Sequence, residues 1–159
     1  MPCARTSPDR HVRTLADAAA RADLLARLDR LTPDHAPAWG RFTAPQMLAH
    51  LADALRMAFG EVSCTPKRVP LVRHFPVKHL MLYVLPFPRN APTARELLAR
   101  APESFDAERA QLARLVARFD PAVAPAAWGP HPLFGSLSGA QWGVLAQRHA
   151  DHHLRQFGV

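Results

Sequence analysis

The spacing of apolar residues predicts four amphipathic helices separated by proline-rich connections. In four segments the apolar residues recur at intervals of three and four, as one face of an α-helix requires. The alternation of apolar and polar residues that marks a β-strand is weak along the whole chain. The pattern therefore predicts an all-α protein whose helices cover residues 14–31, 43–59, 103–119 and 138–157.

Two of the predicted helices begin with a capping box. Thr43 is followed three residues later by Gln46, and Ser138 is followed three residues later by Gln141. In this motif the hydroxyl accepts a hydrogen bond from the backbone of the third residue, and the amide side chain returns one to the cap. Prolines follow the predicted ends of the first and third helices, where they stop helical backbone.

Two long connections separate these helices. Residues 61–102 contain an apolar stretch, 69–85, which we predict to be a short helix broken near Pro76. Residues 93–96 (Thr-Ala-Arg-Glu) are predicted to cap another short helix in the same connection. Residues 121–137 form the second long loop. Loops of this length inside a compact domain are often functional.

Four amphipathic helices with polar outer faces are typical of an antiparallel four-helix bundle. The length of 159 residues suits one domain. We assign residues 14–159 to this domain and expect residues 1–13 to be poorly ordered. The connection between the second and third helices is then an insertion of loop and short helix into the bundle.

Composition excludes several classes of protein. With 48% apolar and 21% charged residues, the chain is globular and not disordered. It has no run of about 18 apolar residues and no apolar core of a secretory signal, so we expect a cytoplasmic protein without a membrane partner. Cys3 and Cys64 are the only cysteines, which excludes a disulfide framework. Cys64 is a candidate nucleophile, although a single loop cysteine is generally inert.

The net charge of +7 comes almost entirely from arginine, which raises the question of a nucleic-acid partner. Arginine in place of lysine is also what a GC-rich coding sequence produces. Near the N-terminus the arginines alternate with aspartates, a pattern typical of solvated helix faces with local ion pairs. We therefore do not expect nucleic acid to be the partner.

Three of the nine histidines form a candidate metal site. His149 and His153 lie about 40° apart on the apolar face of the last predicted helix. His50 lies at the edge of the apolar face of the second. A metal ion held by three inward imidazoles keeps coordination positions open, as in catalytic zinc sites. The helical zinc-protease motif is excluded, because it needs a glutamate where this chain has Ala150. The residues alone leave a second interpretation open, in which each histidine is hydrogen-bonded in the core.

At these residues the chain resembles the DinB/YfiT-like family of metal-binding four-helix bundles. That family has one histidine on the second helix and His-x3-His on the fourth, which correspond here to His50, His149 and His153. The chain is more closely similar to an uncharacterised branch of this superfamily, from about residue 14 to the end. The stretches that match the branch are residues 42–50, Pro86-Phe-Pro88, His131-Pro-Leu-Phe-Gly135, Gln141-Trp-Gly143 and 149–158 (HADHHLRQFG).

The resemblance implies a divalent transition metal, most often nickel or zinc, held by the three histidines, and frequently a homodimer. Characterised relatives include transferases that use low-molecular-weight thiols and thiol-dependent isomerases. His131 and His152 also match the branch. We expect His152 to contact a ligand imidazole and His131 to lie in a loop over the pocket. The alternative for His131 is a role in stabilising a turn.

Two functional hypotheses follow. The first is a metal-dependent enzyme, a transferase or hydrolase acting on a small molecule, whose reaction the sequence does not assign. Asp53 and Gln156 lie one helical turn from His50 and His153, where they are expected to orient the imidazoles. The second hypothesis is a non-catalytic bundle that binds or senses a ligand, with a structural metal or none.

Overall fold

The computed structural model describes residues 12–89, 93–98 and 100–159. Over these ranges the protein is all-helical and contains no β-strand, which confirms the predicted all-α class. The expectation of a poorly ordered N-terminus falls, for residues 1–11, outside the described part of the chain. None of the helices in the described ranges combines the length and the apolar character needed to cross a bilayer.

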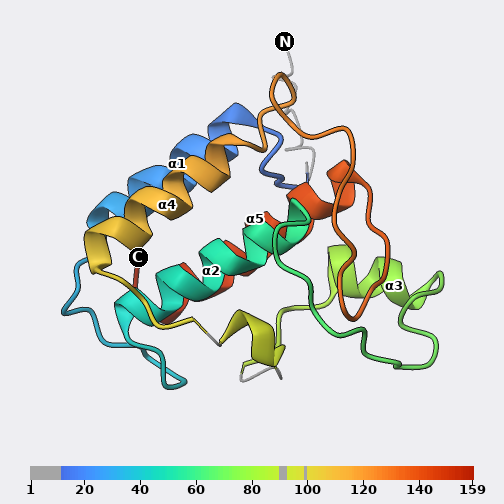
Figure 1. Ribbon diagram of the computed structural model, residues 1–159, viewed down its shortest axis with the longest axis horizontal. Coiled ribbons are helices and arrows are strands. Elements are labelled where there is room, and N and C mark those ends of the chain that lie inside the picture. The colour runs from blue at the N-terminus through green and yellow to red at the C-terminus, as the bar shows by residue number, and fades with distance from the viewer. Residues whose placement is uncertain (1–11, 90–92, 99) are drawn as a thin grey trace, which may run out of the picture.

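Four long helices form the body of the protein: α1 (Ala18–Arg30), α2 (Ala44–Ala58), α4 (Phe105–Ala117) and α5 (Gly139–Gln156). Helix α2 packs against α4 and α5, and α1 packs against the same two helices. Figure 1 shows α1 and α4 side by side, with α5 running behind α2. Helix α2 is buried on nearly all sides, because neighbours cover two of its faces.

Both predicted capping boxes are present. Thr43 Oγ1 accepts from the backbone of Gln46, and Gln46 Oε1 accepts from the Thr43 amide at 2.9 Å. Ser138 and Gln141 make the same pair of hydrogen bonds at the start of α5. The predicted bounds of these two helices consequently agree with the structure to one residue at each end.

The predicted start of the first helix is wrong by four residues. Thr14 Oγ1 accepts from the backbone of Ala16, a local turn that competes with helical backbone. The next residue, Leu15, is fully buried and donates its amide to the carbonyl of Gly143 on α5 at 3.1 Å. The segment before α1 therefore packs on α5. Helix α4 likewise begins at Phe105, two residues later than predicted, because Ser104 is its cap.

The connection between α2 and α4 contains short helical turns. Helix α3 (Val77–His79) begins directly after Pro76 and continues as the π-helical turn η1 (Leu80–Val84). A 3-10 turn, η2 (Arg95–Leu97), follows. The predicted cap of this turn is wrong, because Glu96 Oε1 accepts from the amide and the hydroxyl of Thr65 at 2.8 and 2.7 Å instead.

An ion-pair network is buried beside α2 and α4. Glu108 is only 1% exposed, and its carboxylate accepts hydrogen bonds from Arg100 and from the backbone of Glu103. The same guanidinium donates to both oxygens of Asp53 on α2 at 3.3 Å. Because an isolated buried carboxylate is strongly disfavoured, Arg100 is the counter-charge that the buried Glu108 requires, and it shares Asp53 with Arg56.

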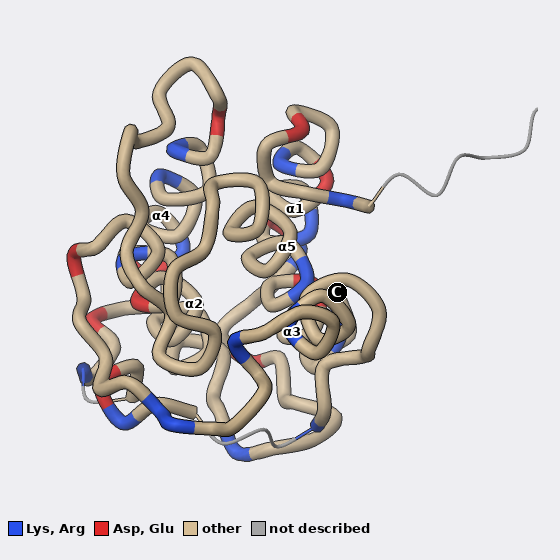
Figure 2. The backbone as a smooth tube through the Cα atoms, turned by 90° about the vertical axis from the view of Figure 1, so that its right-hand side faces the viewer, with Lys and Arg blue, Asp and Glu red and all other residues tan. Residues whose placement is uncertain are grey.

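The net positive charge arises mainly from one segment, because basic and acidic residues nearly balance in the rest of the chain. Residues 62–95 contain six lysines or arginines and no acidic residue, so this segment accounts for nearly all of the net charge of +7. Figure 2 shows lysine and arginine positions along the lower edge of the molecule, where the connection between α2 and α4 runs.

Candidate metal centre

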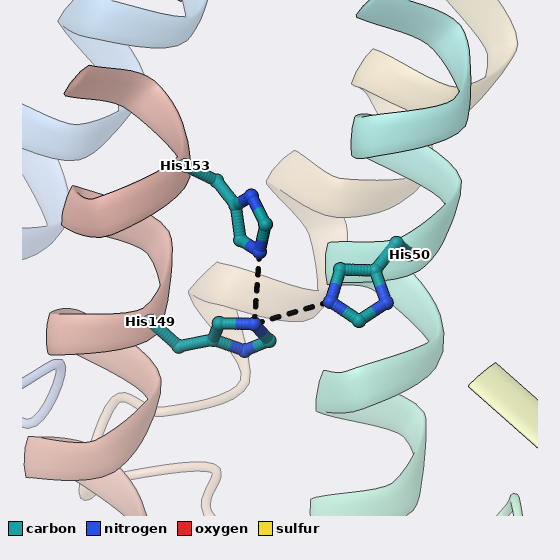
Figure 3. A group of neighbouring side chains, drawn as sticks. All are labelled: His50, His149 and His153. Carbon is teal, nitrogen blue, oxygen red and sulfur yellow. Dashed lines mark hydrogen bonds between the residues drawn. The ribbon is translucent and has the colours of Figure 1, made fainter. Parts of the chain in front are cut away.

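Helices α2 and α5 bring three imidazoles together (Figure 3). His149 Nε2 lies 3.1 Å from His50 Nε2 and 3.1 Å from His153 Nε2. One ring nitrogen from each residue lies within 4.8 Å of the other two, so the three histidines are close enough to hold a metal ion. Nitrogen ligands about 2.0–2.1 Å from a tetrahedral zinc lie about 3.3 Å apart, which is close to the spacing found here.

Neighbouring oxygens fix the tautomers of two of these rings. His153 Nδ1 lies 2.8 Å from Gln156 Oε1, and the amide nitrogen of Gln156 donates to the backbone oxygen of Trp39. His50 Nδ1 faces the carbonyl oxygen of Leu97 at 3.4 Å. Because both oxygens only accept, Nδ1 carries the proton in each ring. The Nε2 atoms of His50 and His153 therefore present lone pairs to the centre of the group.

This arrangement fits a cation better than hydrogen bonds alone. His149 Nε2 faces two lone pairs, and a neutral imidazole can offer at most one proton there. One of the two nitrogen–nitrogen contacts is then left without a hydrogen. A cation between the three nitrogens would satisfy all of them at once, so the donor set fits a metal ion.

The three imidazoles are held in their neutral form. Burial lowers the pKa of His50 and lowers that of His149 well below its usual value. Burial, together with the neighbouring His50, lowers the pKa of His153 to about 3. Neutral imidazole is the form that binds metal, so no proton has to leave these rings at pH 7.

A cavity of about 880 Å³ adjoins the three histidines, with walls from α2, α5, η1 and the connecting loops. Phe42 stacks on the ring of His50, with ring centres 5.2 Å apart. Phe87 stacks on His149, with ring centres 5.8 Å apart. The aromatic residues that line the cavity are Trp39, Phe42, Phe87, Phe134 and Trp142. The centre is therefore open on one side to a large and mainly apolar space.

Of the other predicted site residues, Gln156 and His152 contact the three-histidine centre, whereas Asp53 makes no hydrogen bond to it. Gln156 contacts a ligand ring, as described above, and His152 lines the cavity with its ring centre 5.2 Å from that of His153. Asp53 does not orient His50 by a hydrogen bond: its carboxylate pairs with Arg56 and Arg100. The backbone carbonyl that His50 does use was not predicted.

His131 combines the two roles considered for it. The ring lines the cavity, and Nδ1 accepts from the backbone amides of Leu133 and Phe134 at 3.1 and 3.2 Å. Burial lowers its pKa to about 4, and the nearby charges of Lys67 and Lys78 act in the same direction. His131 is thus a neutral residue that holds the 131–135 turn against the cavity.

Several features of the site lacked a signal in the sequence. Arg41 and Lys67 line the cavity, although they lie in different loops. Trp39 contributes both its ring and its carbonyl. Cys64 is not among the lining residues, and burial raises the pKa of its thiol, which argues against an activated nucleophile.

Comparison with known proteins gives one match. Neither the curated proteins nor the solved structures contain a match to this chain. A family described as "Protein of unknown function (DUF1569)" matches residues 11–158, which include all three histidines and the cavity. The protein therefore belongs to the DUF1569 family, whose function is uncharacterised.

Proposed function

We propose that the protein is a metal-dependent enzyme of the DinB-like type, built as an antiparallel four-helix bundle. His50, His149 and His153 would hold a divalent transition ion, nickel or zinc, through their Nε2 atoms. The observation that carries this proposal is the convergence of three Nε2 atoms. In His50 and His153 the Nε2 atom carries a lone pair, because Leu97 and Gln156 each accept the proton on Nδ1.

Such an ion, when bound, polarises a substrate oxygen or lowers the pKa of a coordinated water or thiol. The protein residues supply the surroundings. Gln156 holds His153 in one orientation, and the Leu97 carbonyl does the same for His50. Phe42 and Phe87 cover the faces of two imidazoles and so restrict the access of water to them. Three protein ligands leave room for a substrate on the side of the cavity.

We propose a transferase or hydrolase reaction on a small molecule. His152 is placed to accept or donate a proton, because it lines the cavity next to His153 and burial lowers its pKa, which keeps it neutral at pH 7. Within the described part of the chain, no Asp or Glu lines the cavity. His152 is therefore the candidate general base.

The same lack of a carboxylate along the described lining favours a second candidate, a bundle that binds a ligand without transforming it. The two candidates differ in what removal of His152 does. An enzyme that uses His152 as a base loses turnover in His152→Ala while it keeps metal and ligand binding. A binding protein shows no turnover of thiol or ester substrates with or without this residue.

Metal analysis tests the proposal directly. Protein purified without an affinity tag and incubated with nickel or zinc is expected to hold about one ion per chain. His50→Ala, His149→Ala and His153→Ala should each lose it, whereas the matched control His152→Ala on the same helix should retain it. Metal-free wild type after incubation would refute the proposal. We also propose the homodimer that the resemblance implies, and sedimentation experiments on the same samples test it.

A further inference from the structure

One ring nitrogen of His131 is occupied by its own turn. Nδ1 accepts hydrogen bonds from the backbone amides of Leu133 and Phe134 at 3.1 and 3.2 Å. A ring nitrogen that accepts from an amide carries no proton, so the ring is neutral and its single proton is on Nε2. The turn thus fixes this tautomer, whereas oxygens fix the opposite one in His50 and His153.

The Nε2–H group of His131 remains available to a ligand. In the described part of the chain, no protein group accepts a hydrogen bond from it. Two described side-chain atoms, Trp39 Nε1 and Gln147 Oε1, are fully buried without a partner, and His131 Nε2 is not one of them. This nitrogen therefore keeps surface open to a ligand or to water, on a ring that lines the cavity.

His131 lies along α5 at a distance from the three-histidine centre. Its ring packs on Trp142, with ring centres 5.6 Å apart. Trp142 and His149 are on the same face of α5 but seven residues apart, which is about 10 Å along a helix. Leu145 and Ala146 lie between them and also line the cavity. An apolar stretch of wall thus separates the His131 donor from the centre.

Helix α2 forms a wall of matching length. His50 and Met57 both line the cavity and are seven residues apart, again about 10 Å along the helix. At the far end, the Gly129 amide donates to the carbonyl of Ala58, and Trp142 Nε1 donates to the carbonyl of Gly129 at 3.0 Å. The end of α2 therefore lies beside the start of α5, and the cavity extends along both helices.

We propose that the cavity binds a ligand with a polar group at each end. One group binds the metal ion at the three histidines, and the other is a carbonyl, hydroxyl or ether oxygen that accepts from His131 Nε2. An apolar chain of about 10 Å joins them. This inference rests on the proposed metal site and adds a substrate class to it. His131 is then a specificity-determining residue, because its donor is too far from the metal-bound group for proton transfer.

Two isomeric hydroxamates test the position of the oxygen, because their common head group chelates zinc and nickel. In 6-methoxyhexanohydroxamate the ether oxygen lies near the far end of the chain, and in 3-butoxypropanohydroxamate it lies near the head. Calorimetric titration of the metal-loaded protein should show that the first binds about fivefold more tightly than the second. This ratio is what one ordinary hydrogen bond contributes.

Two substitutions of His131 separate the donor from the turn. His131→Asn keeps an acceptor where Nδ1 lies and loses the more distant N–H, so the isomers should bind within about twofold of each other. His131→Gln keeps an N–H near the position of Nε2 but loses the acceptor, so it should retain the preference and be less stable. His74→Asn replaces an exposed histidine and is the matched control that leaves the preference unchanged.

Metal content is measured first on every sample, so that two failures can be told apart. Protein that takes up no metal refutes the proposed function and this inference together. Metal-loaded protein that binds neither isomer, binds both equally, or keeps the preference in His131→Asn refutes this inference alone. Nitrogen NMR shifts of the histidine rings test the tautomer in metal-free wild type, where a proton on His131 Nδ1 would also overturn it.

Discussion

Gln156 makes two hydrogen bonds, one to the proposed metal ligand His153 and one to the backbone of Trp39, and different substitutions remove one or both of them. Its oxygen accepts from His153 Nδ1 at 2.8 Å, and its nitrogen donates to the carbonyl of Trp39. The side chain is buried, with 4% exposure. Gln156→Leu removes both hydrogen bonds, whereas Gln156→Glu keeps the acceptor for His153 and loses only the donor.

The two variants should differ in metal affinity. Loss of the acceptor frees the His153 ring to rotate and to change tautomer, and loss of such a partner generally costs ten- to hundredfold in metal affinity. We expect this loss, about 1.4–2.7 kcal/mol, in Gln156→Leu. Gln156→Glu should bind metal at least as tightly as wild type, because a carboxylate is the stronger acceptor for the imidazole N–H.

Folding stability without metal should follow a different order. Gln156→Leu leaves a buried carbonyl and a buried N–H without partners, at about 1–3 kcal/mol each, partly offset by the added apolar surface. Gln156→Glu places a carboxylate beside the Trp39 carbonyl and should also be less stable than wild type. Competition with a chromophoric chelator measures affinity, and urea unfolding of metal-free protein measures stability. Equal metal affinity in both variants would refute the assigned role of Gln156.

Three further outcomes are expected. The pKa of His131 is about 4 in the folded protein and about 6.5 in the unfolded chain, so between these values only the unfolded chain binds the proton. The free energy of unfolding, measured with urea, should therefore fall by up to about 3 kcal/mol as the pH drops from 6.5 to 4. In His131→Asn this fall should be smaller. Arg100→Met leaves the buried Glu108 carboxylate without its counter-charge and should lower the free energy of unfolding in urea by about 3–5 kcal/mol. The double variant Arg100→Met with Glu108→Leu should regain part of this free energy. Equal losses in the single and double variants would contradict the pairing. Ser138→Ala removes the cap of α5 and should cost about 1 kcal/mol, measured by the same unfolding experiment, with Ser136→Ala in the preceding loop as a neutral control.

Local signals account for what the sequence predicted well. The capping boxes of α2 and α5 depend on residues three apart, so their helix bounds follow from the sequence. The start of α1 depends instead on the hydrogen bond between Leu15 and Gly143, which lie far apart in the chain. No periodicity within residues 14–31 contains that information.

The same distinction applies to the candidate site. Helical spacing predicts that His149 and His153 share a face, and the structure brings His50 to them across α2 and α5. Asp53 and Gln156 looked equivalent in sequence, each one turn from a histidine. Arg100, from a distant part of the chain, pairs with Asp53, and a backbone carbonyl, which any residue provides, faces His50 in its place.

One neighbouring pair on α5 connects the histidine centre to the outer wall of the cavity. His149 turns toward the other imidazoles, while the guanidinium of Arg148 donates to the backbone oxygens of Met81, Leu82 and Leu85 at the end of η1. These carbonyls end a helical turn, where a cation is favourable. Adjacent residues of α5 thus hold both the histidine centre and the wall formed by residues 81–85. A movement of this wall to admit a large ligand would therefore displace Arg148 and, with it, the neighbouring His149.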